Sequence, residues 1–273
     1  MTLNLPPFTR WVKRLILIYA GICLFMALLK LVSPYAREWT LVYLGLIPQQ
    51  VMHGYVWQVI TYSFLHFQLG HLLSNALGLW MFGAFIESDW GSRRFLEFYF
   101  FCTIAAAVTT VAMGYSHILG LSQSTPTIGA SGGLFGLLAA YAVLYGEMQF
   151  MMLPLPFFIK AKYLAWGYVF IALMGAIQET GGISYVAHLG GFLFGYLYLK
   201  FLPRRGLMFA SSEKYFSFRN AYYRWRRRRA AKKFEVYMRD HDRDVHFDEH
   251  GNYVPDEDRK NKENGGSKSG WVN

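Results

Sequence analysis

Long apolar runs constrain the fold of this chain more than any other feature of its sequence. A helix needs about 20 apolar residues to cross the hydrocarbon core of a bilayer. The runs approach that length, and 54% of all residues are hydrophobic while only 16% are charged. The sequence therefore predicts an all-α polytopic membrane protein with six transmembrane helices. The six runs cover approximately residues 15–32, 69–88, 95–114, 131–147, 162–178 and 184–202.

The charged residues divide the chain into three parts. Residues 1–202 carry ten Lys/Arg and six Asp/Glu, whereas residues 203–273 carry seventeen and eleven. We therefore expect a membrane domain over 15–202, a short N-terminal segment over 1–14, and a basic, partly disordered tail over 203–273. Positive residues concentrate in the segments before the first run, after the sixth, and in alternate loops between them. The positive-inside rule then places both termini in the cytoplasm, and the lack of an evident transit peptide favours a bacterial inner (plasma) membrane.

Polar residues lie near the start of three of the apolar runs. His71 and Asn75 begin the second run. Ser131 begins the fourth, and His188 lies in the first turns of the sixth. The three helices would cross the membrane in the same direction, so these side chains are expected at one level beneath the outer surface. Polar groups inside a membrane are costly and usually mark a functional site.

Glycines crowd around Ser131 in the stretch TPTIGASGGLFG, residues 125–136. Small residues at this spacing are ordinary helix-packing devices, so the serine alone leaves a purely structural interpretation open. The sixth run carries a matching glycine face beside His188. Two such faces let helix backbones approach closely, and we expect this contact to bring the hydroxyl within hydrogen-bond reach of the imidazole. The supporting glycines are Gly129, Gly132, Gly191 and Gly195.

These motifs resemble those of the rhomboid family of intramembrane serine proteases. The resemblance covers about residues 50–202 and rests on GASGGLFG, AHLGGFLFG and HLLSN, together with Glu87 after WMFGAFI. One position departs from it, because many relatives have Trp-Arg in the first external loop where this chain has Trp57-Gln58. His66 is similar to a loop histidine that has a structural role in the family.

The resemblance implies a six-helix rhomboid-like bundle with a defined set of site residues. Ser131 would be the nucleophile and His188 the general base. His71 and Asn75 would contribute to the oxyanion hole, and Phe135 would stack against the ring of His188. Because Ser131 opens a helix, its own backbone N–H is also free to join the oxyanion hole.

The acidic residues of the membrane domain are not placed to orient His188. The expected helices put four of them near the opposite side of the membrane and two in external loops. We therefore expect a Ser-His dyad in place of a triad with a buried carboxylate, and neither a metal nor a cofactor. The six acids are Glu38, Glu87, Asp89, Glu97, Glu147 and Glu179.

The expected substrate is a single-pass transmembrane protein, cleaved near its outer end where Gly, Pro or small polar residues weaken the helix. The resemblance implies that the fifth run and the loop Gly181-Gly182-Ile183 form the entry gate. The alternative is a non-catalytic rhomboid-like membrane chaperone or dislocation factor, although inactive relatives usually lack the serine or the histidine. A channel or transporter has weak support, since no charged pathway or inverted repeat is evident.

The tail begins with a basic, aromatic segment. Arg226, Arg227, Arg228 and Arg229 follow Tyr222, Tyr223 and Trp225. Because this segment follows the last apolar run, we expect it to bind anionic lipids, at about 1 kcal/mol per basic residue, and we do not expect nucleic acid. A short helix is predicted here, and disorder or a small interaction segment is predicted after it because charges alternate and the sequence ends rich in Gly and Ser.

Overall fold

The computed structural model describes residues 6–116, 122–151, 158–177, 182–201, 207–241 and 243–255. Its contacts divide the chain into two compact units, Met1–Leu207 and Met208–Asn273. The first unit contains all six predicted apolar runs, and the second contains nearly all of the basic tail.

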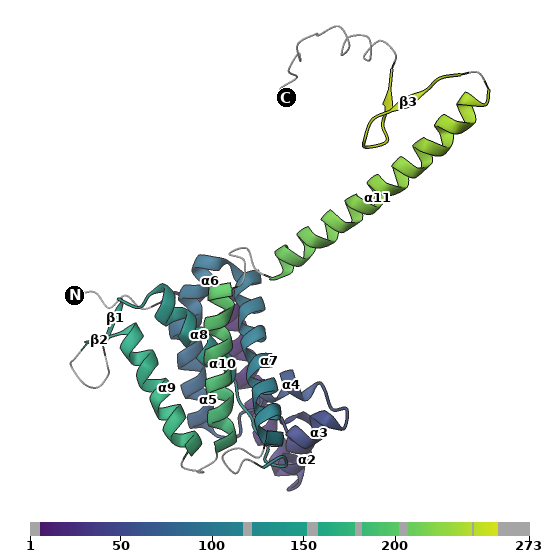
Figure 1. The fold of residues 1–273 in the computed structure, drawn as a ribbon. Coiled ribbons are helices and arrows are strands. Elements are labelled where there is room, and N and C mark those ends of the chain that lie inside the picture. Colours follow the sequence, from purple (N-terminus) through teal and green to yellow (C-terminus); the bar gives the residue numbers. More distant parts are fainter. Residues whose placement is uncertain are drawn as a thin grey trace. The chain divides into compact units, whose positions relative to one another are not determined.

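Each apolar run forms a helix in the first unit (Figure 1). The second run is one continuous rod in which a π-helical turn, η2, joins two α-helices. The predicted and observed bounds agree within a few residues, because polar residues, proline or glycine flank each run. The helices are α1 (Arg10–Val32), α5 (Leu69–Gly78) with η2 (Leu79–Gly83) and α6 (Ala84–Trp90), α7 (Ser92–Ser116), α8 (Ser131–Leu144), α9 (Ala161–Ile177) and α10 (Gly182–Phe201).

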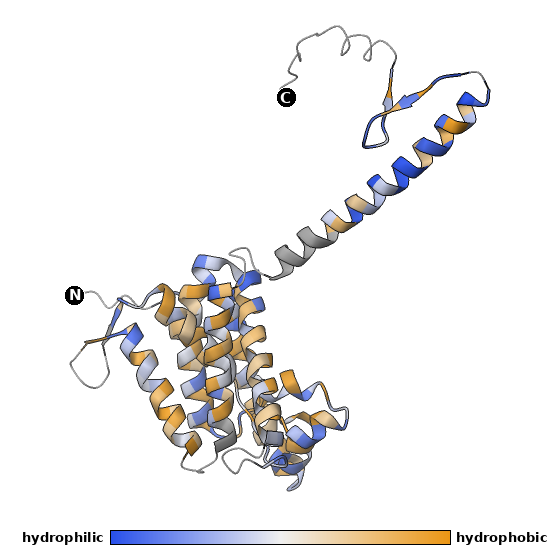
Figure 2. Ribbon diagram, in the orientation of Figure 1, coloured by the Kyte–Doolittle hydropathy of each residue, from blue (hydrophilic) through white to orange (hydrophobic). Residues whose placement is uncertain are grey.

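Among the residues that the structure describes, three segments are long and apolar enough to cross a membrane, namely Arg10–Val32, Leu69–Trp90 and Ser92–Ser116. α8 and α9 are apolar but shorter, so a count of six crossings stays a prediction. Large apolar side chains point outward from the bundle, as Phe25 of α1 and Phe170 of α9 do. Figure 2 shows this apolar colouring over the helices of the first unit and a predominantly hydrophilic α11 in the second.

The central helix of the first unit is α8. Most of its residues are buried, and it packs against α7 on one side and α10 on another. α7 contributes Phe95, Phe98 and Tyr99 to the main hydrophobic core. Because α8 is enclosed, the position of Ser131 at its first residue is fixed by the surrounding helices.

The segment between α1 and α5 folds into four short helices that the sequence analysis did not predict. The side chain of Gln58 holds this segment together: its Oε1 accepts a hydrogen bond from Ile47 N at 3.0 Å, and its Nε2 donates to Val42 O at 2.8 Å. A β-bridge between Leu46 and Thr127 connects the segment to the residues just before α8. The four helices are α2 (Ala36–Leu44), α3 (Pro48–Met52), α4 (Gln58–Thr61) and η1 (Tyr62–Phe64).

At the other end of the bundle, the carboxylate of Glu87 caps the start of α1. It accepts hydrogen bonds from the Thr9 hydroxyl at 2.5 Å, from the backbone N–H groups of Trp11 and Val12, and from the Ser92 hydroxyl at 2.6 Å. These donors include N–H groups that have no partner within α1. A buried negative charge is also favourable at a helix N-terminus because of the helix dipole.

Three further elements complete the described chain. A hairpin of β1 (Gln149–Met151) and β2 (Phe158–Lys160) joins α8 to α9. In the second unit, α11 (Leu207–Arg239) runs for 33 residues, far beyond the short helix predicted from the sequence. A second hairpin, β3 (His246–Phe247) with β4 (Tyr253–Val254), forms in the stretch for which disorder or a small interaction segment is predicted, while residues 256–273 lie outside the described part.

Candidate active site

The hydroxyl of Ser131 and the imidazole of His188 form a direct hydrogen bond. Their Oγ and Nε2 atoms lie 2.7 Å apart, although 57 residues separate them in the sequence. Ser131 is the first residue of α8 and His188 lies in α10. The structure therefore brings together the two residues that the sequence analysis assigned to nucleophile and base.

Glycine at two levels allows α8 and α10 to approach this closely. A Cβ atom on Gly191 would overlap the carbonyl oxygen of Gly132, and one on Gly195 would lie 2.8 Å from the Cα atom of Gly136. The glycines of α8 also face a third helix, because a Cβ on Gly133 would lie 2.7 Å from the ring of Tyr99 in α7. The sequence patterns predicted the α8–α10 contact but not the contact between α8 and α7.

Aromatic rings enclose the imidazole. Phe135 lies parallel to His188 with 4.3 Å between ring centroids and an interplanar angle of 4°. Tyr185 meets the same imidazole edge to face at 6.0 Å, and Tyr168 meets Phe135 in the same manner at 6.2 Å. Phe135 occupies the position beside the imidazole that the family resemblance implies.

His71 and Asn75 pack against the turn that precedes Ser131. Gly129 in this turn has φ of +107°, and a Cβ atom there would lie 2.6 Å from the imidazole of His71 and 3.5 Å from the amide nitrogen of Asn75. Glycine is thus required twice at this position, by the backbone conformation and by the space that His71 occupies. Because Ser131 is the first residue of α8, its backbone N–H has no partner within that helix.

His66 joins this group, and sequence reasoning gave it no more than a structural match. It is fully buried, its ring lies 5.0 Å from that of His71, and its Nε2 lies 2.9 Å from the amide nitrogen of Asn75 and 3.4 Å from Ala130 N. Two donors converge on this nitrogen, so it is the unprotonated one. Burial lowers the pKa of His66 to about 4, with the neighbouring His71 as a further cause. The segment before α5 has no periodic pattern, so nothing in the sequence places this ring beside Asn75.

The acids of the first unit are engaged elsewhere. Glu87 caps α1, Asp89 accepts a hydrogen bond from Tyr145, Glu97 from Tyr198, and Glu147 pairs with Lys160 and Lys162. Within the described ranges, no carboxylate hydrogen-bonds to His188, and no three His, Cys, Asp or Glu side chains are grouped to hold a metal ion. The acid Glu179 lies outside the described residues, as does Gly181 of the predicted gate.

The arrangement has the parts that acyl transfer to a hydroxyl requires. A serine hydroxyl becomes nucleophilic when an adjacent base takes its proton, and His188 is within reach. A developing oxyanion needs fixed donors nearby, and the open N–H of Ser131, with His71 and Asn75 beside Gly129, lies in that region.

Comparison with known proteins identifies related chains. The Rhomboid domain family matches residues 53–205. Rhomboid protein 1, mitochondrial, of Saccharomyces cerevisiae is 30% identical over 145 residues, or 51% of this chain and 40% of that protein. Rhomboid-like protein 19 of Arabidopsis thaliana is 29% identical over 171 residues, which are 61% of this chain and 55% of that protein. The human presenilin-associated rhomboid-like protein, mitochondrial, is 29% identical over 140 residues, or 51% and 36%.

These matches correct the predicted location of the protein and limit what its relatives imply about its activity. Several relatives are mitochondrial by name, so the bacterial plasma membrane predicted from the sequence is wrong. That prediction rested on the N-terminal residues, which carry little information about the compartment. The matches span between 36% and 55% of these three relatives, so the activity of a whole relative does not transfer directly to this chain.

Proposed function

Because the chain belongs to the rhomboid family, we propose that it is an intramembrane serine endopeptidase that acts through a Ser131–His188 dyad. The observation that carries this proposal is the 2.7 Å hydrogen bond between Ser131 Oγ and His188 Nε2. The stacked ring of Phe135 supports it, because the ring restricts rotation of the imidazole where a triad would use a carboxylate.

The proposed reaction proceeds through an acyl-enzyme. Ser131 Oγ attacks the carbonyl carbon of the scissile peptide bond while His188 Nε2 takes the hydroxyl proton. The C–N bond then breaks and His188 returns that proton to the departing amine. Water, activated by the same imidazole, hydrolyses the ester and restores the serine.

The oxyanion formed in each half-reaction needs donors that are already oriented. We assign this role to the backbone N–H of Ser131 and the side chains of His71 and Asn75. An amide nitrogen carries two N–H groups, so Asn75 can donate one to His66 and still offer the other. Removal of one such donor typically costs about 10²–10³ in rate.

The substrate that fits this site is a transmembrane segment of another membrane protein. The nucleophile lies at the first residue of α8, so cleavage would occur near one end of the substrate helix, where water is accessible. We propose entry beside α9, whose buried residues are all alanines: Ala161, Ala165, Ala172 and Ala176. The mitochondrial names of relatives support a mitochondrial membrane as the location.

We propose a second partner for the tail, an anionic lipid surface. Arg226, Arg228 and Arg229 are exposed on α11, beside exposed rings of Tyr222 and Trp225. Aromatic and basic side chains on one helix are suited to the interface of a membrane. Flotation of the full chain with vesicles that differ only in anionic lipid tests this proposal, with all four arginines from 226 to 229 replaced by Gln as the comparison.

Reconstitution into liposomes with a labelled single-pass helix tests the protease proposal. Ser131→Ala and His188→Ala are expected to abolish cleavage while the protein still folds, and a fluorophosphonate probe is expected to label the wild type but not Ser131→Ala. Ser122→Ala is a matched control, because this exposed hydroxyl hydrogen-bonds to Ser124 and to no other residue that the structure describes. Cleavage by Ser131→Ala at the wild-type rate would exclude the dyad. Absence of both cleavage and labelling in the wild type would favour the non-catalytic chaperone or dislocation factor.

A further inference from the structure

The second unit contains a pocket that the protease proposal does not use. It has a volume of about 340 Å³ and lies between α11 and the turn of the β3–β4 hairpin. This volume is at the small end of the range of about 300–1,000 Å³ that is typical of ligand sites. The residues that line it are Asn220, Tyr223, Arg224, Arg227, His250 and Asn252.

Hydrogen bonds and close packing hold the hairpin side of the pocket in place. Arg227 donates a hydrogen bond to Asn252 Oδ1 at 2.7 Å, and Gly251 packs so tightly that a Cβ atom there would lie 2.9 Å from the backbone nitrogen of Arg228. Asp248 closes the turn by accepting hydrogen bonds from Asn252 N and His250 N, both at 2.8 Å. The turn is therefore seated on the helix.

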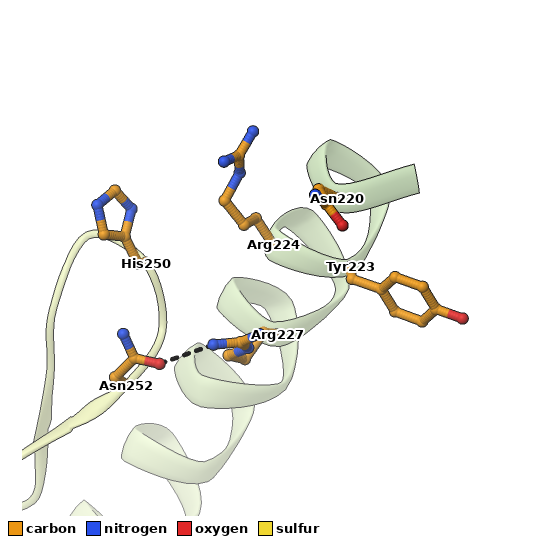
Figure 3. A pocket seen from close by; sticks show the side chains of 6 residues that line it. All are labelled: Asn220, Tyr223, Arg224, Arg227, His250 and Asn252. Carbon is orange, nitrogen blue, oxygen red and sulfur yellow. Dashed lines mark hydrogen bonds between the residues drawn. The ribbon is translucent and has the colours of Figure 1, made fainter. Parts of the chain in front are cut away.

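Two arginines one turn apart give the pocket its chemistry. Figure 3 shows Arg224 and Arg227 on the side of α11 that faces the hairpin, with His250 at the tip of the turn. A guanidinium has five N–H donors, and Arg227 donates one of them to Asn252. Arg224 makes no hydrogen bond or ion pair with any residue in the described part of the second unit. Donors of this kind suit the oxygens of a phosphate group.

The surrounding charge also favours an anion. Between residues 219 and 233 the helix carries eight Lys or Arg and no acid. On the hairpin, the carboxylate of Glu249 lies 3.6 Å from His250 Nε2, and that of Asp248 is occupied by its own turn. We propose that this pocket binds a phosphate group, carried either by a phospholipid headgroup or by a small soluble phosphate compound.

Helical geometry supplies a matched control for this site. Residues nine apart on a helix lie on opposite faces at about 100° per residue, so Lys233 points away from the face on which Arg224 lines the pocket. Both are exposed basic residues of the same helix. Arg224→Gln and Lys233→Gln therefore remove the same charge, and only the first alters the pocket. Neither disturbs the Arg227–Asn252 hydrogen bond that holds the hairpin.

Calorimetric titration of the full chain in a phosphate-free maltoside detergent tests the proposal. The ligands are inorganic phosphate and dioctanoyl phosphatidic acid, with dioctanoyl phosphatidylcholine as the lipid control. Arg224→Gln is expected to weaken binding about tenfold or more, as expected for the loss of a charge-assisted hydrogen bond, whereas Lys233→Gln stays close to the wild type. Binding of phosphatidic acid alone identifies a lipid headgroup as the source, and binding of inorganic phosphate identifies a soluble compound.

Two results would overturn this site. The first is the lack of binding of either phosphate ligand to the wild type. The second is an equal loss in Arg224→Gln and Lys233→Gln, which would show that the charge of the helix acts without a pocket. Ser131→Ala is expected to bind like the wild type, so the result is independent of proteolysis.

Discussion

Phe135 and His188 form a parallel ring stack, with 4.3 Å between their centroids. Both rings also have an edge-to-face neighbour, Tyr168 for the first and Tyr185 for the second. The orientation of the imidazole is thus fixed by packing and by one hydrogen bond, to Ser131.

Loss of the Phe135 ring is expected to impair catalysis through misplacement of the base. We predict that Phe135→Ala lowers kcat by about 10²-fold, the size of effect that a misplaced group causes, with a smaller change in KM. Phe135→Tyr keeps the ring and is expected to retain most activity. Cleavage of a labelled transmembrane substrate in liposomes measures both. A wild-type kcat in Phe135→Ala would show that the stack does not position His188.

The contact between Gly191 and Gly132 is expected to tolerate no side chain. Gly191→Ala places a methyl group on a backbone carbonyl, and such overpacking costs about 1–3 kcal/mol or more. We predict a lower thermal unfolding midpoint in detergent and loss of activity. Gly21→Ala in α1 is the control, because nothing lies within 4 Å of its Cβ position, and the better helix propensity should leave stability equal or higher. Equal midpoints for the two variants would contradict the close α8–α10 contact.

Removal of the Glu87 carboxylate is expected to release the start of α1. Glu87→Ala leaves the hydroxyl of Thr9 and the N–H groups of Trp11 and Val12 without their acceptor. An unsatisfied buried group costs about 1–3 kcal/mol. Faster proteolysis near Thr9 and a lower unfolding midpoint are the expected results. Glu38→Ala, at an exposed position of α2, should change neither, and an effect as large as that of Glu87→Ala would point to charge alone.

Gln58 is expected to be a structural residue of the segment between α1 and α5. Gln58→Ala leaves Ile47 N and Val42 O without their partner, so we predict faster hydrogen exchange at the Ile47 amide and a lower unfolding midpoint. Gln49→Ala, an exposed side chain of α3, is the control. Unchanged exchange at Ile47 in Gln58→Ala would show that this hydrogen bond does not hold the segment.

Acid is expected to destabilise the protein through His66. Its folded pKa of about 4 lies below the ordinary value of about 6.5, so the unfolded chain binds a proton more readily. The linked loss of stability begins as pH falls below about 6.5 and is complete near pH 4. Unfolding midpoints measured across this window should fall less steeply in His66→Gln than in the wild type. Gln49→Ala, which removes an exposed side chain that does not titrate, should leave the slope unchanged, and parallel slopes for all three proteins would remove His66 as the cause.

Helix positions could be predicted because apolar runs and their polar ends are local features of the sequence. Ser131 and His188 could be predicted to meet because their depths follow from the direction in which successive helices cross. The glycine faces gave the same contact from a second, independent pattern. The contact of Gly133 with α7 was missed, because spacing alone does not tell which neighbour a glycine faces.

The rest of the site depends on tertiary contacts without a local pattern. The short helices between α1 and α5 have too few residues to show a periodicity. Gln58 and His66 are polar residues in that region, and their hydrogen-bond partners become known only from the folded structure. The β3–β4 hairpin could not be predicted because its sequence is charged and lacks an apolar pattern. It is held against α11 by the close approach of Gly251 to the helix backbone and by the ring contact of Phe247.

The four buried alanines of α9 attach this helix to the bundle by a different kind of contact from the one that joins α8 to α10. Gly132, Gly136, Gly191 and Gly195 fix α8 to α10 backbone against backbone, so the reacting atoms cannot drift apart. α9 is attached by methyl groups and by the ring of Tyr185 over Gly175, and its bulky side chains face outward. Under the proposed entry beside α9, substitutions along that outer face would change which helices enter, and how quickly, while Ser131 and His188 keep their positions.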